Sequence, residues 1–356
     1  MPVVKFSFLI LASLIYLNSY GQPSNSPGPL QLDNIITHTI KSSIIGEEYT
    51  IYVLKTDNYD TTGTRLPVLY MMDGDWSMTV AMNCFRMLRQ DYATHEPLVV
   101  GIGYGKNQNM RVRDLDPKNG GPEFLSFIEK EVMPFIDKTY RTTKEKAVYG
   151  YSMGGMFTTY ILFNRSDLFQ KIFIGAPGNN GGELMPAARE YFKNHNDLKS
   201  KVFIGVGSFE KGVVRNIDSF TTYLNSKKLP DLDINTVITP DAGHGAALAQ
   251  VMQNAIAYGY CEKHKPISIN ASSLKKYAGN YILYENNTVS AEANVFSKDG
   301  KLFLIWKQPN AIADELVSFG TNEFFVPANE RMSFKFTNKE LIISVAADKD
   351  YHLVKK

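Results

Sequence analysis

The sequence has few cysteines and no strong excess of one charge. Its 356 residues include 2 cysteines, Cys84 and Cys261, which excludes a small scaffold held together by disulfides. The two could pair in an oxidising compartment, but they lie in different parts of the chain, and we favour two separate buried thiols. The formal net charge is +2, without a sustained basic run. The charge pattern therefore gives no indication of a nucleic acid or an anionic membrane as a partner.

The hydrophobic run near the N-terminus, residues 6–17, is too short to span a bilayer comfortably, and a lysine precedes it. Ser19 and Gly21 then stand two residues apart, as a signal peptidase requires. This pattern predicts a signal peptide over residues 1–21 and an exported protein, periplasmic or secreted, with no membrane insertion after cleavage. A retained membrane anchor is the alternative. Residues 22–34 are rich in Ser, Pro, Gly and Asn and predict a flexible leader.

The sequence Gly-Tyr-Ser-Met-Gly-Gly at residues 150–155 follows a short apolar run and precedes an apolar helical run. A G-x-S-x-G motif between a strand and a helix is typical of a nucleophile elbow. Gly150 and Gly154 lack the Cβ atoms that would collide in so tight a turn, so Ser152 can hold a strained backbone with its hydroxyl exposed. Gly155 would let the helix pack close to the sheet. The alternative is a turn in which Ser152 caps the helix.

A serine nucleophile requires a histidine base and a carboxylate that orients it. In α/β-hydrolases these follow the serine in the order serine, acid, histidine. Glu210 comes just after a predicted strand, at the edge where open α/β sheets build their sites, and is the predicted acid. Asp218 and Asp241 are the alternatives. His244, flanked by glycines in the loop after the last strand of the domain, is the predicted base and completes the order begun by Ser152.

Acyl transfer also requires hydrogen-bond donors for the developing oxyanion. α/β-Hydrolases take one from the residue after the nucleophile and one from the loop after an early strand. The first donor is predicted to be the backbone N–H of Met153. The buried run at residues 66–72 ends in Asp-Gly-Asp-Trp, and the N–H of Asp75 is the predicted second donor. An ordinary Asp-Gly turn is the alternative.

Three further side chains are predicted to contact the substrate. Arg111 and Arg113 follow a buried strand, beside the predicted mouth of the site, and suit an acidic or polyhydroxylated ligand. Trp76 directly follows the Asp-Gly-Asp turn. The alternative for the arginines is an Arg-Asp pair, with Asp114 of the same segment, that locks their loop. We find no His, Cys and carboxylate cluster with metal-ligand spacing near the site, so neither a metal nor a cofactor is expected.

The fold class expected is α/β. Over residues 35–262 an opening antiparallel pair is followed by buried strands that alternate with helices, one of them over residues 124–140, which predicts an α/β-hydrolase domain with a mostly parallel central sheet. Residues 263–356 contain short aromatic-rich strands separated by turns such as residues 298–300. They predict a small antiparallel sheet or barrel. We assign its aromatic residues mainly to the core, with carbohydrate stacking as the alternative.

Taken together, these motifs resemble the esterase D-like "putative esterase" group of α/β-hydrolases, over roughly residues 35–262. The group includes siderophore, feruloyl and acetyl-xylan esterases, S-formylglutathione hydrolases and the antigen 85 mycolyltransferases. The turn at residues 73–75 and the arginine-containing loop at residues 111–117 are most similar to the siderophore trilactone esterases. The C-terminal region is similar to the small β domains appended to periplasmic serine hydrolases of the β-lactamase-like type.

The resemblance implies Ser152 as nucleophile, His244 as base, Glu210 as acid, and the amides of Asp75 and Met153 as the oxyanion hole. It implies a serine carboxylic ester hydrolase whose partner is a small-molecule or carbohydrate ester, and the predicted signal peptide adds export. A siderophore trilactone is the first substrate hypothesis, and a feruloyl or acetyl ester of a carbohydrate is the second. An antigen 85-like acyltransferase and a non-catalytic binding protein are the alternatives from other classes. The oligomeric state is left open.

Overall fold

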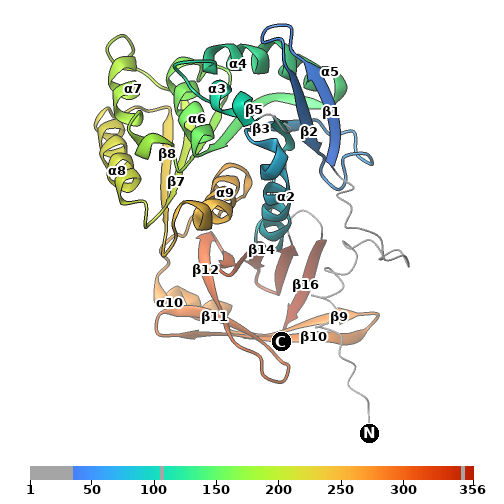
Figure 1. Cartoon of the computed structure of the whole chain (residues 1–356). Coiled ribbons are helices and arrows are strands. Elements are labelled where there is room, and N and C mark those ends of the chain that lie inside the picture. The colour runs from blue at the N-terminus through green and yellow to red at the C-terminus, as the bar shows by residue number, and fades with distance from the viewer. Residues whose placement is uncertain (1–34, 105–107, 346–348) are drawn as a thin grey trace. The chain divides into compact units, whose positions relative to one another are not determined.

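The structure is a computed structural model that describes residues 35–104, 108–345 and 349–356. The predicted signal peptide and leader lie outside these residues. The chain divides into two compact units, which are described separately here (Figure 1). Residues 35–88 with 94–261 form the first unit, and residues 262–356 form most of the second.

The first unit contains a mostly parallel eight-stranded sheet with the order β1-β2-β4-β3-β5-β6-β7-β8 (Figure 1). Strand β2 is antiparallel to both of its neighbours, and the strands from β4 to β8 pair in parallel. This is the α/β-hydrolase fold expected from the sequence. Its strands are β1 (Ile35–Lys41), β2 (Glu48–Leu54), β3 (Leu66–Met71), β4 (Leu98–Gly103), β5 (Thr142–Tyr151), β6 (Lys171–Gly175), β7 (Ser200–Gly207) and β8 (Leu232–Thr239).

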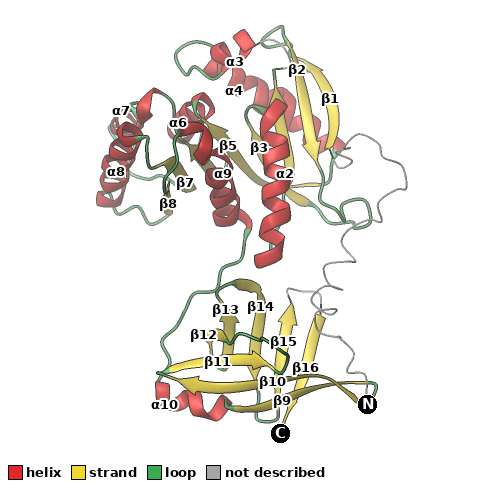
Figure 2. Ribbon diagram, turned by 60° about the horizontal axis from the view of Figure 1, so that its bottom comes forward, coloured by secondary structure: helices red, strands yellow, loops and turns green. Residues whose placement is uncertain are grey.

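Helices cover this sheet, so its central strands are buried along nearly their whole length; all six residues of β4 are buried. Helices α2 and α9 lie side by side (Figure 2). Phe85 of α2 and Tyr260 of α9 have ring centroids 6.1 Å apart. On α4 and α6, Phe124 and Phe157 pack with centroids 5.4 Å apart. The larger helices are α2 (Gly74–Asp91), α6 (Met153–Asn164), α7 (Leu184–Tyr191), α8 (Lys211–Ser226) and α9 (His244–Tyr260).

Two segments differ from the sequence-based expectation. The helix predicted over residues 124–140 consists of α4 (Gly121–Phe127), the π-helical η1 (Ile128–Val132) and α5 (Met133–Thr139). The Met133 N–H donates to the Ile128 carbonyl, five residues back, and Pro134 follows without an N–H of its own, which accounts for the wider turn. In addition, the segment with the two arginines, taken as loop, contains the short helix α3 (Gln108–Asp114).

The second unit is a closed antiparallel barrel of eight strands, which decides between the sheet and the barrel left open by the sequence. The predicted turn at Asp299 and Gly300 joins β10 to β11, with φ angles of 50° and 75°. Strands β10, β12 and β16 were not predicted. The unit contains α10 (Ala271–Leu274), η3 (Lys275–Tyr277), β9 (Gly279–Glu285), β10 (Thr288–Lys298), β11 (Lys301–Trp306), β12 (Asp314–Gly320), β13 (Glu323–Val326), β14 (Asn329–Phe336), β15 (Glu340–Val345) and β16 (Lys349–Lys355).

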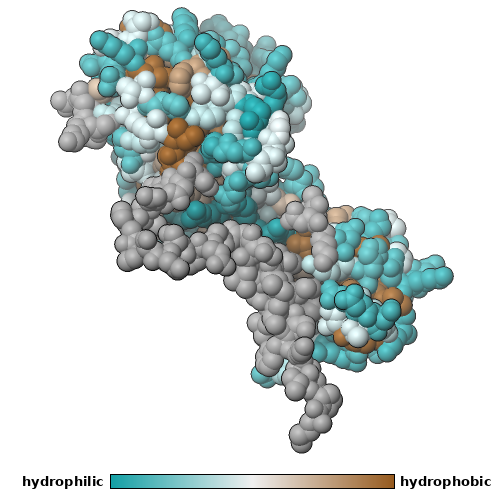
Figure 3. Space-filling model, turned by 90° about the vertical axis from the view of Figure 1, so that its right-hand side faces the viewer, coloured by the Kyte–Doolittle hydropathy of each residue, from teal (hydrophilic) through white to brown (hydrophobic). Residues whose placement is uncertain are grey.

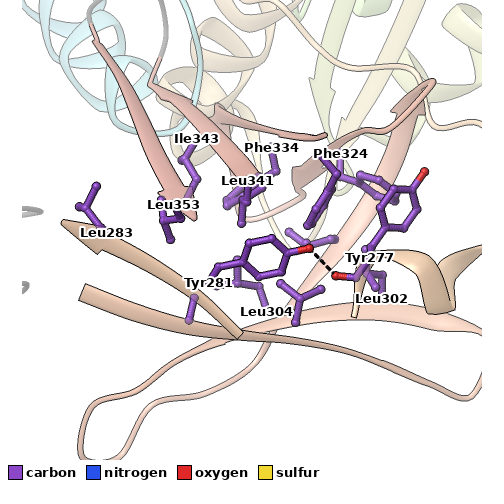
Figure 4. Packing of buried hydrophobic residues seen from close by; sticks show 14 of the residues in the cluster. Tyr277, Tyr281, Leu283, Leu302, Leu304, Phe324, Phe334, Leu341, Ile343 and Leu353 are labelled. Atoms are coloured by element: carbon purple, nitrogen blue, oxygen red, sulfur yellow. Dashed lines mark hydrogen bonds between the residues drawn. The ribbon is translucent and has the colours of Figure 1, made fainter. Parts of the chain in front are cut away.

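Alternate residues of these strands fill the interior of the barrel (Figure 4). Phe324, Phe334 and Phe336 belong to this buried cluster together with Tyr277 and Tyr281. The Tyr281 hydroxyl donates to the Tyr277 carbonyl at 2.8 Å, so its polar end is satisfied inside the core. The core assignment made for most of these aromatics is therefore confirmed.

Cys84 and Cys261 form no disulfide with each other, as the sequence favoured, but of the two thiols expected to be buried, that of Cys84 is buried and that of Cys261 is not. Cys84 is buried on α2, and its Sγ lies 3.7 Å from the Ala249 carbonyl of α9. Burial raises the pKa of the Cys84 thiol to about 11, so it stays protonated at neutral pH. Cys261 is partly exposed at the end of α9.

Among the described residues, none of the helices combines the length and the apolar character that crossing a bilayer would require. On the face seen in Figure 3, most of the described surface is hydrophilic, and apolar residues form small separate patches.

The turn from β5 into α6 leaves no space for a side chain at Gly150. A Cβ atom there would lie 2.1 Å from the Gly154 carbonyl oxygen and 2.3 Å from its carbon. These are backbone atoms and cannot move aside independently, so the turn depends on glycine at this position.

We therefore expect Gly150→Ala to lower the free energy of unfolding by about 3 kcal/mol, because the added methyl group overpacks the turn. Gly63→Ala is the matched control, since a Cβ atom at Gly63 meets nothing within 4 Å. Urea denaturation of both variants measures the difference. Equal midpoints for the two would contradict this account of the turn.

Candidate active site

Ser152 lies between β5 and α6 with φ 59° and ψ −116°, a strained backbone conformation for a residue with a side chain. Three hydrogen bonds hold it. The Ser152 N–H donates to the Gly175 carbonyl at 2.9 Å, and the Ser152 carbonyl accepts from the N–H groups of Met156 and Gly178 at 3.0 and 2.8 Å. Its side chain makes no capping bond to α6, so the alternative of a helix-capping serine finds no support. The local geometry is that of a nucleophile elbow.

Glu210 and His244 meet at the carboxyl edge of the same sheet. Glu210 stands between β7 and α8, and His244 is the first residue of α9. His244 Nδ1 lies 2.7 Å from Glu210 Oε2. The side chain of Glu210 is 15% exposed and that of His244 is 48% exposed. Of the three described carboxylates considered as the acid, Glu210 is the one bonded to His244; Asp218 lies within α8, and Asp241 is in the turn before α9.

Between the described residues Ser152 and His244 the structure contains no hydrogen bond. The other oxygen of Glu210, Oε1, is buried and has no hydrogen-bond partner among the described residues. The predicted acid and the predicted base are thus hydrogen-bonded to each other, and the predicted nucleophile is bonded to neither.

The turn after β3 lies directly against the elbow. A Cβ atom on Gly154 would be 3.3 Å from Met72 Cβ and 3.7 Å from Asp73 Oδ2. Asp75 stands in the first turn of α2, and Met153 is the first residue of α6. The first N–H groups of a helix have no partner within the helix and carry a partial positive charge. Both predicted oxyanion donors therefore come from helix N-termini at neighbouring strand ends.

The side chain of Asp75 anchors this turn to two other strands. Its Oδ1 accepts from the Tyr52 hydroxyl at 3.0 Å, and its Oδ2 accepts from the Tyr104 N–H at 2.7 Å. These bonds join the start of α2 to β2 and to the end of β4. The carboxylate is therefore engaged in structure, which leaves the backbone N–H as the group that Asp75 can offer to a ligand.

Arg111 forms a two-point ion pair with the buried Asp73. Its Nε and NH2 groups donate to Oδ1 and Oδ2 of Asp73 at 2.5 and 2.9 Å. Its NH1 group lies 3.4 Å from Met153 Sδ. The side chain of Asp73 is 1% exposed, and its φ angle is 60°. Burial raises the pKa of Asp73, and the hydrogen bonds and charge of Arg111 oppose part of that rise.

Arg113 is also paired within the protein. Its Nε donates to Asp114 Oδ1 at 2.8 Å, and its NH2 group donates to the Tyr49 hydroxyl at 3.2 Å. Both arginines thus hold the segment between β4 and α4 in place, the arrangement that the sequence left open as an alternative. Their role in substrate binding stays a prediction. Trp76, 38% exposed in the first turn of α2, has an accessible surface.

Two residues at the site were not assigned a role from the sequence. Asp73 is the partner of Arg111, and Tyr151 donates from its hydroxyl to the His244 carbonyl at 2.5 Å. A lone aspartate before a glycine signals only a turn, and the residue between Gly150 and Ser152 varies freely in a G-x-S-x-G pattern. Neither contact had a sequence signal.

No group of three or more His, Cys, Asp or Glu residues among the described ranges is arranged to hold a metal ion. The site is accordingly described by its protein groups alone.

Residues 42–216 match the model of a family described as putative esterase. Over these 175 residues, just under half of the chain, the sequence is similar to that family. The matched range contains Ser152 and Glu210 and ends before His244, which the structure joins to Glu210.

Two relatives show which kinds of esterase are similar to this chain. The "Ferri-bacillibactin esterase BesA" of Bacillus subtilis is 28% identical over 136 residues, 31% of this chain and 47% of that protein. The "Endo-1,4-beta-xylanase/feruloyl esterase" of Xylanibacter ruminicola is 29% identical over 167 residues, 44% of this chain and 22% of that protein. The chain thus spans less than half the length of either relative. The solved BES protein from Bacillus cereus has the same fold, with a TM-score of 0.57 at 21% identity, over 67% of this chain and 98% of that one.

Arg111→Met is expected to destabilise the protein by about 3–5 kcal/mol at neutral pH, because it leaves the buried Asp73 carboxylate unpaired. Without Arg111 the pKa of Asp73 rises further. The difference from wild type is then largest above that pKa, where Asp73 is ionised, and shrinks as the pH falls through it and the group becomes neutral.

Urea denaturation at several pH values measures this effect, with Arg189→Met, at an exposed position of α7, as the matched control. The double variant with Asp73→Asn should recover much of the loss. A loss that is independent of pH, or equal in the control, would contradict the assignment.

Proposed function

We propose that the chain is a serine carboxylic ester hydrolase in which Ser152 is the nucleophile, His244 the general base and Glu210 the acid that orients it. The observation that carries this proposal is the 2.7 Å contact between Glu210 Oε2 and His244 Nδ1 at the sheet edge that bears the elbow. An ionised carboxylate only accepts hydrogen bonds, so Nδ1 carries the hydrogen and Nε2 keeps its lone pair. That lone pair is what a serine proton requires. The match of residues 42–216 to the putative esterase family supports the same reaction.

In the proposed mechanism Ser152 Oγ attacks the ester carbonyl carbon while His244 Nε2 takes its proton. The oxyanion accepts hydrogen bonds from the Met153 and Asp75 amides, each of which can contribute about 3 kcal/mol of transition-state stabilisation. Collapse of this intermediate expels the alcohol, which takes the proton from His244, and leaves an acyl-enzyme. Water, deprotonated by His244, then releases the carboxylic acid and restores Ser152.

A siderophore trilactone ester is the first substrate we propose. The Asp-Gly-Asp turn and arginine-containing segment support it, and so does the ferri-bacillibactin esterase activity named for the Bacillus subtilis relative. In this proposal Arg111 and Arg113 act mainly by fixing the wall of the site, because their guanidinium groups already hold carboxylates. Trp76 is then the residue proposed to make ring contacts with the substrate.

An aromatic acyl ester of a carbohydrate is the second candidate, and the exposed apolar side chains favour it. Phe209, 64% exposed, precedes Glu210 directly, and Trp76 is 38% exposed beside Asp75. Large, exposed aromatic side chains can stack on an aromatic acid. The feruloyl esterase activity named for the Xylanibacter ruminicola relative supports this candidate.

Export belongs to the same proposal. The pattern at residues 1–21 predicts a signal peptide, which would place the mature enzyme in the periplasm or outside the cell. Sequencing of the exported protein from its N-terminus, expected to begin at Gln22, tests this part separately.

The first test is the intact mass of the protein after reaction with a fluorophosphonate probe. We expect one adduct on wild type and none on Ser152→Ala, because the probe reacts with an activated serine. His244→Ala should be labelled about 1,000-fold more slowly, since the serine loses its base. Heat-denatured wild type is the negative control. If the folded wild type stays unlabelled while a reference serine hydrolase reacts, the proposed function is wrong.

The substrate class is then decided by hydrolysis of a tris-catecholate trilactone and of a feruloylated arabinose. A kcat/KM at least tenfold higher for the trilactone would support the first candidate, and the reverse would support the second. Transfer of the acyl group to an added sugar in preference to water would instead indicate an acyltransferase.

Trp76→Ala is expected to raise KM about fivefold for the preferred aromatic substrate, at nearly constant kcat, because a ring contact made equally in ground and transition states is lost. Met87→Ala is the matched control, since Met87 is 58% exposed on the same helix but far from its first turn. Steady-state kinetics measure both. An unchanged KM in Trp76→Ala would remove Trp76 from the substrate-binding residues.

A further inference from the structure

Tyr151 connects the strand that carries the nucleophile to the residue proposed as the base. It is the last residue of β5 and directly precedes Ser152. Its hydroxyl donates to the His244 carbonyl at 2.5 Å, and its ring packs against the imidazole with centroids 5.2 Å apart and planes at 48°. One side chain therefore makes both a backbone and a ring contact with His244.

The neighbouring strand leaves space for this side chain. Tyr151 pairs with Gly175 of β6, and a Cβ atom on Gly175 would lie 2.4 Å from the Tyr151 ring. Any larger residue at this position would force the ring away from His244. The ring is 3% exposed and so is held by its surroundings.

The hydroxyl of Tyr151 stays protonated at neutral pH, and so remains a hydrogen-bond donor. Burial, and then the negative charge of Glu210, raise the pKa of Tyr151 above its usual value near 10. The bond to the His244 carbonyl therefore persists wherever the imidazole is neutral and able to accept a proton.

We infer that Tyr151 is a positioning residue, which fixes the start of α9 and with it the imidazole of His244 at the sheet edge that carries Ser152. The inference rests on the proposed function, in which His244 takes the proton of Ser152. Tyr151 itself does not touch the reacting atoms. Glu210 sets the rotation of the imidazole through Nδ1, and Tyr151 sets the place of the backbone that carries the ring.

Tyr149 provides a matched control from the same strand. It lies two residues before Tyr151, is 1% exposed, and its hydroxyl is buried without a hydrogen-bond partner among the described residues. Tyr149→Phe and Tyr151→Phe thus remove the same atom from similar surroundings, and they differ in whether that atom holds His244.

The experiment compares kcat and KM of wild type, Tyr151→Phe and Tyr149→Phe on p-nitrophenyl acetate, together with the rate constant for fluorophosphonate labelling. Active-site titration with the probe counts the competent molecules, so that kcat refers to folded enzyme. We expect Tyr151→Phe to lower kcat and the labelling rate by roughly 10- to 100-fold with KM changed less than twofold, because a small displacement of a catalytic group costs rate more than binding. Tyr149→Phe should match wild type within twofold.

Two results would overturn the positioning role while the esterase proposal stands. One is a Tyr151→Phe enzyme whose kcat stays within twofold of wild type, whatever its thermal stability. The other is an equal fall in Tyr149→Phe, which would trace the loss to the strand in general. A folded wild type that neither reacts with the probe nor hydrolyses the ester would overturn the proposed function and this inference together.

Discussion

The close approach of Gly150 and Gly154 is the constraint on which the candidate site depends. Because Gly150 has no side chain to meet the Gly154 carbonyl, β5 can pass into α6 through one residue, Ser152, whose φ angle is 59°. The same edge of the sheet holds further residues with side chains in left-handed conformations, each within two residues of a strand end. With Ser152 they are Asp73, Ala176 and Asp241. Such conformations are costly and persist only where the surroundings enforce them, so the strain in this unit gathers at the edge that carries the proposed chemistry.

The charged side chains near the site mainly stabilise the fold by pairing with one another. Asp73 is almost fully buried at a strained turn, and an unpaired carboxylate there would favour unfolding. Arg111 satisfies both of its oxygens and also reaches the sulfur of Met153, so one side chain joins the two turns that carry the predicted oxyanion donors. A fork-shaped guanidinium suits this task, whereas a lysine would satisfy only part of the carboxylate. This is why two arginines beside the mouth of a site do not by themselves indicate an anionic substrate.

Much of this arrangement could be predicted from the sequence, for physical reasons. Buried parallel strands are continuous apolar runs, and the elbow requires glycines at fixed spacing, so both are visible in the chain. The pairing of Arg111 with Asp73 was not visible in the sequence, because the two residues are 38 positions apart. Only the parallel pairing of β3 and β4 brings their segments together. In the barrel, β10 was missed because alanines occupy inward positions such as Ala291 and Ala293. Small residues fit a crowded interior, but they give little β signal.

The loops at the carboxyl edge of the sheet are hydrogen-bonded to neighbouring loops as well as joined to their own strands. The Ser152 N–H donates to the carbonyl of Gly175, the last residue of β6, and the Phe209 N–H after β7 donates to the Ala242 carbonyl after β8. The Tyr151 hydroxyl then spans from β5 to the start of α9. Each residue proposed for catalysis is therefore placed by groups from a neighbouring loop, and its position is a property of the whole edge. Substitutions in different loops of this edge should consequently couple, because residues that share hydrogen-bond partners do not contribute independently.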